Sequence, residues 1–133
     1  MQKFIKSSID YIEQNLKTDI TADELAGMAN YSVGHFCRLF AQTMDSTVAS
    51  YILKRRLDHA LAEISSGKKA VGVVLEYGFD TYAGFYKAFV KMYGCSPKKY
   101  LSIIKKSEVL IMYSKKDIQT IVPLPNLQIR YFE

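Results

Sequence analysis

The chain has 133 residues, of which 49% are hydrophobic and 23% are charged, and its formal net charge is +5. That length suits one compact domain, and the composition excludes disordered and fibrous classes of protein. Because no apolar run approaches the roughly 18 residues that cross a bilayer, and the first residues lack the apolar core of a signal peptide, we expect a cytoplasmic protein with no membrane partner.

The sequence offers few groups for catalysis or metal binding. Its two cysteines and two histidines fit no metal-ligand spacing. No Gly-rich phosphate loop or nucleophile motif is present. We therefore expect no catalytic residue, no cofactor and no metal, and the chain is predicted not to be an enzyme.

Charge is distributed unevenly along the chain. Residues 54–106 carry eleven Lys or Arg and four Asp or Glu, whereas residues 1–53 carry four and six. A basic half-domain suits a polyanionic partner such as nucleic acid. A solvated lysine-rich surface would account for the same charge, so the charge alone does not decide between these readings.

Seven helices are predicted between residues 4 and 106, because apolar residues recur there at helical spacing. Residues that start helices bound them: Thr21 and Glu24 form a capping-box pattern, and Ser96 precedes a proline at the first helical position. Asn30 follows the second predicted helix, at a position that would tolerate a left-handed turn residue. The predicted helices span 4–16, 21–29, 32–43, 47–65 and 70–77, then a sixth from Asp80 or Thr81 to Tyr93 and a last one from Pro97. The sequence therefore predicts an all-α domain.

An internal repeat relates the two halves of this domain. Ala26, Asn30 and Tyr31 match Val74, Gly78 and Phe79 at an offset of 48, and Phe36, Leu39 and Phe40 match Phe85, Ala88 and Phe89 at an offset of 49. Each half thus has a short helix, a turn residue followed by an aromatic, and an amphipathic helix, which is the pattern of a helix-turn-helix. We predict one such unit near residues 21–43 and another near 70–93, joined by a linker helix over 47–65. A plain bundle with two similar helical hairpins is the alternative.

Two segments resemble a known family. Residues 76–100 contain Gly-Phe, a capping residue, Phe, a basic residue, Phe and then Gly-Cys-Ser-Pro-Lys-Lys-Tyr, and residues 30–40 read Asn-Tyr-Ser-Val-Gly-His-Phe-Cys-Arg-Leu-Phe. Over about residues 5–104 the chain resembles the DNA-binding domain of AraC/XylS-type transcription regulators. The resemblance implies a double helix-turn-helix that binds double-stranded DNA, with RNA polymerase as a further partner and activation as its effect.

Three residues depart from the pattern of that family. Asn30 replaces the usual turn glycine, Leu101 replaces a frequent arginine, and Val74 stands where alanine is common. Because valine is bulkier than alanine at a helix junction, we expect a slight rearrangement of the second unit.

Candidate DNA contacts lie in the N-terminal half of each second helix, which faces the major groove in such units. The resemblance implies base contacts at positions 34, 37, 38, 82, 83, 84, 86 and 87. We expect Arg38 to read guanine, with a phosphate contact or an ion pair as the alternative, and Lys87 to meet a phosphate. The full candidate set is Val33, Gly34, Cys37, Arg38, Tyr82, Ala83, Gly84, Tyr86 and Lys87, with Lys91 and Arg55 as further cationic residues.

Residues 107–133 differ from the helical domain that spans residues 1–106. Residues 109–113, 118–122 and 127–132 are predicted strands, because they are rich in residues that favour β structure. The segment from 118 to 132 looks like the opening strand of a gyrase-inhibitor-like effector-binding domain. On this interpretation we expect the chain to be a fragment of a longer effector-responsive regulator, and a small-molecule effector is expected only if the chain continues beyond residue 133. The alternative is that the chain is a small regulator in its own right. The alternative function is a helical protein-interaction module.

Overall fold

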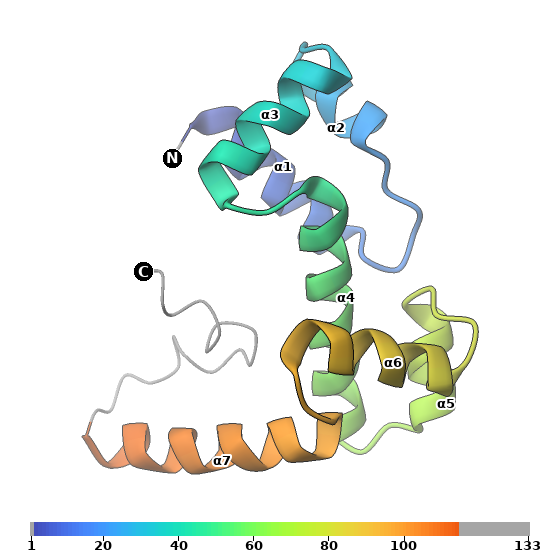
Figure 1. Ribbon diagram of the computed structural model, residues 1–133, viewed down its shortest axis with the longest axis vertical. Coiled ribbons are helices and arrows are strands. Elements are labelled where there is room, and N and C mark those ends of the chain that lie inside the picture. Colours follow the sequence, from blue (N-terminus) through green and yellow to red (C-terminus); the bar gives the residue numbers. More distant parts are fainter. Residues whose placement is uncertain (1, 115–133) are drawn as a thin grey trace. The chain divides into compact units, whose positions relative to one another are not determined.

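The computed structural model describes the backbone of residues 2–114 and the side chains of residues 2–105. In the described backbone there are seven helices and no strand (Figure 1), which confirms the predicted all-α fold. None of these helices is both long and apolar enough to cross a membrane. The helices are α1 (Lys3–Gln14), α2 (Ala22–Met28), α3 (Val33–Met44), α4 (Val48–Ser65), α5 (Ala70–Glu76), α6 (Tyr82–Tyr93) and α7 (Pro97–Ser114).

The chain divides into two compact units, Met1–Arg56 and Leu57–Glu133, with the boundary inside α4. The first unit contains the helix pair α2 and α3, and the second contains the pair α5 and α6. Each unit therefore holds one of the two predicted helix-turn-helix motifs.

Side-chain caps set the starts of the helices at the predicted residues. Thr21 and Glu24 form a complete capping box at the start of α2, with both hydrogen bonds at 3.1 Å. Ser32 accepts from the backbone N–H of the third residue of α3, and Thr81 does the same for α6 at 2.9 Å. Because each cap satisfies an amide that has no partner within the helix, the sequence marks these starts directly.

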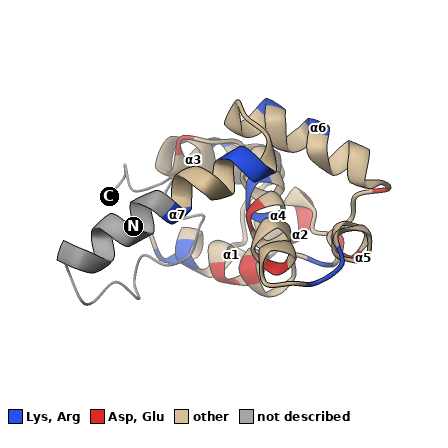
Figure 2. Cartoon of the chain, turned by 90° about the horizontal axis from the view of Figure 1, so that it is seen from below, with Lys and Arg blue, Asp and Glu red and all other residues tan. Residues whose placement is uncertain are grey.

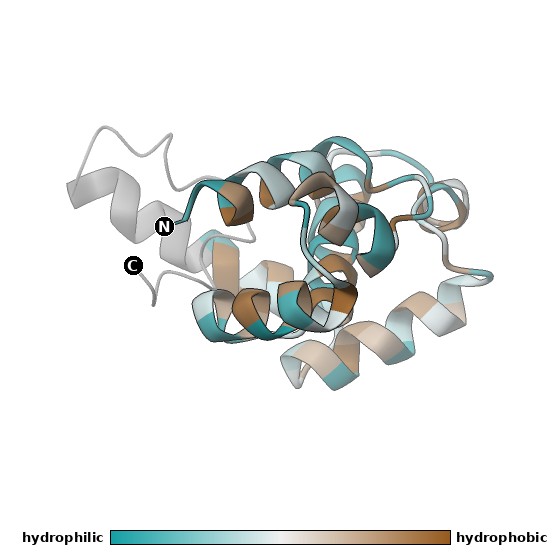
Figure 3. Cartoon of the chain, turned by 90° about the horizontal axis from the view of Figure 1, so that it is seen from above, coloured by the Kyte–Doolittle hydropathy of each residue, from teal (hydrophilic) through white to brown (hydrophobic). Residues whose placement is uncertain are grey.

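The core of each unit is built around a pair of phenylalanines, from α3 in the first unit and from α6 in the second. Phe36 and Phe40 of α3 are fully buried in the first unit, as are Phe85 and Phe89 of α6 in the second. Figure 3 shows hydrophobic and hydrophilic segments interspersed along the helices of the chain, as expected for amphipathic helices. Three residues that share the helical spacing of this core are only half-buried, namely Leu39, Ala88 and Met92.

The strand predicted over residues 109–113 is wrong, because α7 continues through it to Ser114. Within that segment Val109 and Ile111 favour strands, but Leu110 and Met112 are good helix formers. A helix that already exists adds one hydrogen bond for each residue fixed, whereas a new strand would need a partner. The other two predicted strands lie outside the described residues.

Candidate nucleic-acid interface

The turn inside each helix-turn-helix is closed by an equivalent hydrogen bond in both units. The backbone N–H of Tyr31 donates to the carbonyl of Ala26 at 3.0 Å, and that of Phe79 donates to the carbonyl of Val74, also at 3.0 Å. Val74 is fully buried at this junction. The second turn therefore keeps this hydrogen bond with the larger side chain buried beside it.

Left-handed residues make these two turns possible. Asn30 has a φ of 60° and Gly78 a φ of 91°. Asparagine tolerates this conformation better than most residues because its short polar side chain can bond locally, so it can stand where glycine is usual. The prediction of a left-handed turn at Asn30 is confirmed.

The aromatic residue after each turn packs against the helix that follows. The ring of Tyr31 lies 4.7 Å from that of His35 in α3 and 5.0 Å from that of Phe4 in α1. The ring of Phe79 lies 5.4 Å from that of Phe85 in α6. These contacts hold α3 and α6 against the preceding turns, with their outer faces in solvent.

The outer face of α3 presents one cation, Arg38, one turn beyond the start of the helix. Val33 is 40% exposed, and both Gly34 and Arg38 are exposed. A Cβ atom at Gly34 would lie 3.5 Å from one guanidinium nitrogen of Arg38. The Arg38 side chain therefore runs back toward the start of α3, the part that enters the groove in helix-turn-helix proteins.

The outer face of α6 presents all of its predicted contact residues to solvent. Tyr82 and Tyr86 are 38% and 42% exposed, and Ala83, Gly84 and Lys87 are also exposed. The structure thus brings them together on one surface of one helix, although contact with DNA stays a prediction.

The internal repeat identifies two further candidates that residue type alone did not. At an offset of 49, Arg38 corresponds to Lys87, so Gln42 corresponds to Lys91 and His35 to Gly84. Both Gln42 and His35 are exposed on α3. Because a glutamine can bond adenine through two hydrogen bonds, Gln42 belongs on the list of candidate readers.

The cations on the two outer faces have no acidic partner among the described residues. Arg38, Lys87 and Lys91 form no ion pair or hydrogen bond within that part of the chain. Figure 2 shows blue segments and no red ones along α6. A cation without an intramolecular partner remains available to a phosphate or a base.

Arg55 and Arg56, in contrast, make hydrogen bonds within the first unit. The Arg55 guanidinium donates to both carboxylate oxygens of Glu13, from Nε at 2.6 Å and from Nη2 at 2.8 Å. Its side chain is 13% exposed. Arg56 donates to the backbone carbonyls of Leu16 and Thr18 at 2.9 and 2.6 Å. Arg55, a predicted DNA contact, is thus occupied by a bidentate pair, and both arginines join α4 to α1 and the loop after it.

We expect Arg55→Met to destabilise the protein without altering how it responds to salt when it binds DNA. Loss of a bidentate, charge-assisted pair should lower the free energy of unfolding by about 1–3 kcal/mol. Urea denaturation and salt-dependent DNA titration measure the two effects. Glu13→Gln is the matched control and should destabilise in the same direction. A reduced salt dependence with unchanged stability would instead make Arg55 a phosphate contact.

Cys37 lies at the edge of the predicted interface. It is half-buried and lines an apolar hollow of about 380 Å³ together with Ile20, Val48 and Ile52. Part of the Cys37 side chain therefore packs inside the first unit, whereas Arg38 is exposed to solvent.

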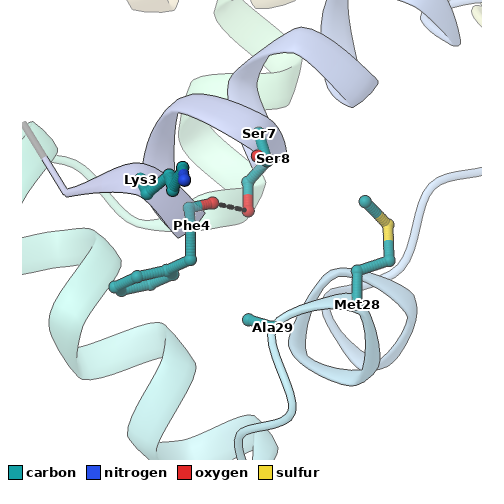
Figure 4. Close-up of a pocket in the computed structure, with 6 residues that line it drawn as sticks. All are labelled: Lys3, Phe4, Ser7, Ser8, Met28 and Ala29. Carbon is teal, nitrogen blue, oxygen red and sulfur yellow. Dashed lines mark hydrogen bonds between the residues drawn. The ribbon is translucent and has the colours of Figure 1, made fainter.

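A second hollow in the first unit carries no catalytic constellation (Figure 4). Lys3, Phe4 and Ser8 of α1 line it, with Met28 across from them. The hydroxyl of Ser8 already donates to the carbonyl of Phe4 at 2.8 Å. In the described part of the chain, no three His, Cys, Asp or Glu side chains lie together as metal ligands would.

One titratable group in this unit is clearly perturbed. The phenol of Tyr11 donates to the Glu24 carboxylate at 3.0 Å. This hydrogen bond raises the pKa of Tyr11, and burial and the carboxylate charge add to the shift in the same direction. The contact supports α2 from α1 and lies apart from the predicted DNA contacts.

Comparison with known proteins identifies relatives of most of the helical region. A family model described as a helix-turn-helix domain matches residues 25–103. The chain is 30% identical over 106 residues to an uncharacterized HTH-type transcriptional regulator, YbfP, of Bacillus subtilis, covering 79% of this chain and 36% of YbfP. It is 28% identical over 113 residues to the HTH-type transcriptional activator AarP of Providencia stuartii, covering 84% of each. The chain thus spans about a third of YbfP but most of AarP.

A solved structure shares the fold. The crystal structure of a transcriptional regulator from Chromobacterium violaceum, described as having an AraC-type DNA-binding domain, superposes with a TM-score of 0.66 at 22% identity. The match covers 72% of this chain and 87% of that one. The family model covers residues 25–103, which include both turns and the capped helices α3 and α6. This chain therefore belongs to the AraC-type family of helix-turn-helix DNA-binding domains.

Proposed function

We propose that the protein regulates transcription by binding a specific duplex sequence, with α3 and α6 each lying in a major groove. The observation that carries this proposal is the repeated geometry of the two units. Each has a capped helix that follows a similar turn, and its outer face carries at least one exposed cation with no ion-pair partner among the described residues. Arg38 supplies the cation of α3, and Lys87 and Lys91 supply those of α6.

The two helices are proposed to read successive segments of one duplex. Helix-turn-helix pairs bind half-sites about one helical turn, or roughly 34 Å, apart. One chain can then occupy a non-palindromic site of two boxes. We further propose that binding activates transcription through contact with RNA polymerase, in line with the description of AarP as an activator.

Selection of bound duplexes from a random library, at two salt concentrations, tests this function. The expected result is an asymmetric motif of two boxes about 10 base pairs apart, with weaker retention at the higher salt. Failure to enrich any motif would contradict the proposal and favour the protein-interaction module. A single enriched box would restrict DNA reading to one unit.

We expect Gly84→Ala to act in opposite directions on stability and on DNA binding. A Cβ atom there would meet only the Thr81 hydroxyl, at 3.4 Å, so the fold does not require glycine. Alanine should raise the free energy of unfolding by up to about 1 kcal/mol. We also propose that the backbone of α6 approaches the DNA groove closely at Gly84. The added methyl should therefore weaken DNA binding.

Gly72→Ala on α5 is the matched control for this prediction. A Cβ atom at Gly72 has no neighbour within 4 Å, and α5 is not the helix proposed to enter the groove. It should gain stability and keep its affinity. Equal or tighter DNA binding by the Gly84→Ala protein would exclude close approach at that position.

A further inference from the structure

The starts of the two recognition helices differ in their chemistry. On α3 the outer face carries His35 and Arg38, which can hydrogen-bond to base edges. On α6 the first turn and a half presents Tyr82, Ala83 and Gly84, followed by Tyr86, and carries no charged or amide side chain before Lys87. Bidentate hydrogen bonding, the usual way to identify a base pair, is therefore not available at the start of α6.

Two tyrosine rings give this part of α6 a fixed apolar surface. Tyr82 and Tyr86 are one helical turn apart, with ring centroids 6.3 Å apart. The ring of Tyr82 also lies 5.6 Å from that of Phe85, which is fully buried. Because the buried Phe85 supports the Tyr82 ring, and that ring in turn contacts Tyr86, less conformational entropy remains to be lost when the rings meet a ligand.

The small residues beside the rings leave the surface between them shallow. Ala83 contributes one methyl group, and Gly84 none, so the backbone of α6 can approach a groove closely there. Neither tyrosine hydroxyl is hydrogen-bonded to another described residue, so both can reach phosphates at the groove edge while the ring faces pack on bases. The surface is thus apolar at its centre and polar at its rim.

We infer, on the basis of the proposed function, that Tyr82 and Tyr86 determine specificity by packing on the C5-methyl groups of thymines in the second box. That methyl is the one apolar group that bases present in the major groove, and an aromatic ring is a suitable contact for it. The second box is therefore read by shape and apolar contact, and the first by hydrogen bonds from α3.

Substituting deoxyuridine for thymine in the selected duplex tests this inference, because it removes only the methyl group. The second box is identified as the one whose base preference survives Arg38→Ala. Binding to the intact chain should weaken about fourfold for each contacted methyl lost there. The same substitution in the first box should change binding by less than about twofold. Tyr86→Ala should bind the thymine and deoxyuridine duplexes with a smaller difference than the unmodified protein.

The Tyr82→Phe and Tyr86→Phe variants separate methyl recognition from phosphate contact. They remove only the hydroxyls, so the preference for thymine over deoxyuridine should persist even if overall affinity falls. Binding that is insensitive to deoxyuridine, or a second box without thymine, would overturn the inference and leave the proposed function standing. Absence of any sequence-specific duplex binding would overturn both.

Discussion

Phe85→Ala should lower the free energy of unfolding by about 3–5 kcal/mol, the usual cost of truncating a buried phenylalanine. Phe85 is fully buried and contacts the rings of Phe79, Tyr82 and Phe89. Its removal takes away transfer free energy and leaves a cavity beneath the start of α6. Most small domains have only 5–15 kcal/mol of stability, so much of the second unit's stability would be lost. Urea denaturation followed by far-UV circular dichroism measures the change.

Phe85→Leu provides the conservative control, since it retains most of the buried apolar volume. It should cost less than half as much as the alanine variant. Phe36→Ala, at the equivalent position of the first unit, should destabilise by a similar amount because Phe36 is also fully buried. A loss below about 1 kcal/mol for Phe85→Ala would contradict the described core of the second unit.

Lys87→Ala with Lys91→Ala should weaken DNA binding more than Arg38→Ala does. If each lysine neutralises one phosphate, losing both reduces the salt slope by about 1.8, which corresponds to roughly 60-fold in affinity at 0.1 M salt. Arg38→Ala should cost about 1–2 kcal/mol, or roughly 5- to 30-fold, and relax base preference in the first box. Fluorescence anisotropy titrations across a range of salt concentrations measure both quantities.

Charge-conserving variants separate the two roles. Lys87→Arg with Lys91→Arg should retain the salt slope, because each side chain keeps its charge. Arg38→Lys should retain most of the affinity but lose the preference for guanine, because lysine lacks the planar fork. If the double lysine variant bound DNA more tightly than Arg38→Ala, the two lysines of α6 would contribute less to DNA binding than Arg38, against the expectation.

Local sequence signals predicted most of the fold, because the features they encode are themselves local. Thr21, Ser32 and Thr81 cap helices with hydrogen bonds that reach only three residues along the chain. Asn30 and Gly78 form left-handed turns for reasons of backbone sterics alone. The repeat added what single signals lacked, since a pattern that occurs twice identifies a supersecondary unit.

Contacts between residues far apart in sequence were not predictable in the same way. Arg55 is a predicted DNA contact as a cation on the linker helix, yet its carboxylate partner Glu13 lies 42 residues earlier. No periodicity relates the two positions. Their pairing depends on how α1 packs against α4 within the first unit, which residue spacing does not specify.

The candidate site was predictable as a surface but not in its details. Helical spacing indicated which residues of α3 and α6 lie outward, and Arg38, Tyr82 and Lys87 are exposed as that spacing requires. The packing of the Tyr82 ring on Phe85 and the return of Arg38 toward Gly34 depend on rotamers. On these two features rests the inference that α3 reads bases through hydrogen bonds and α6 through contact with thymine methyl groups.

An equilibrium titration of the unmodified protein against the selected two-box duplex, and against a shuffled duplex of equal length and composition, tests the central claim most directly. At physiological salt the selected duplex should bind at least about 1,000-fold more tightly, as sequence-specific regulators do. Equal affinities that fall together as salt increases would instead reveal a non-specific polycation surface, and would contradict a sequence-reading function for α3 and α6.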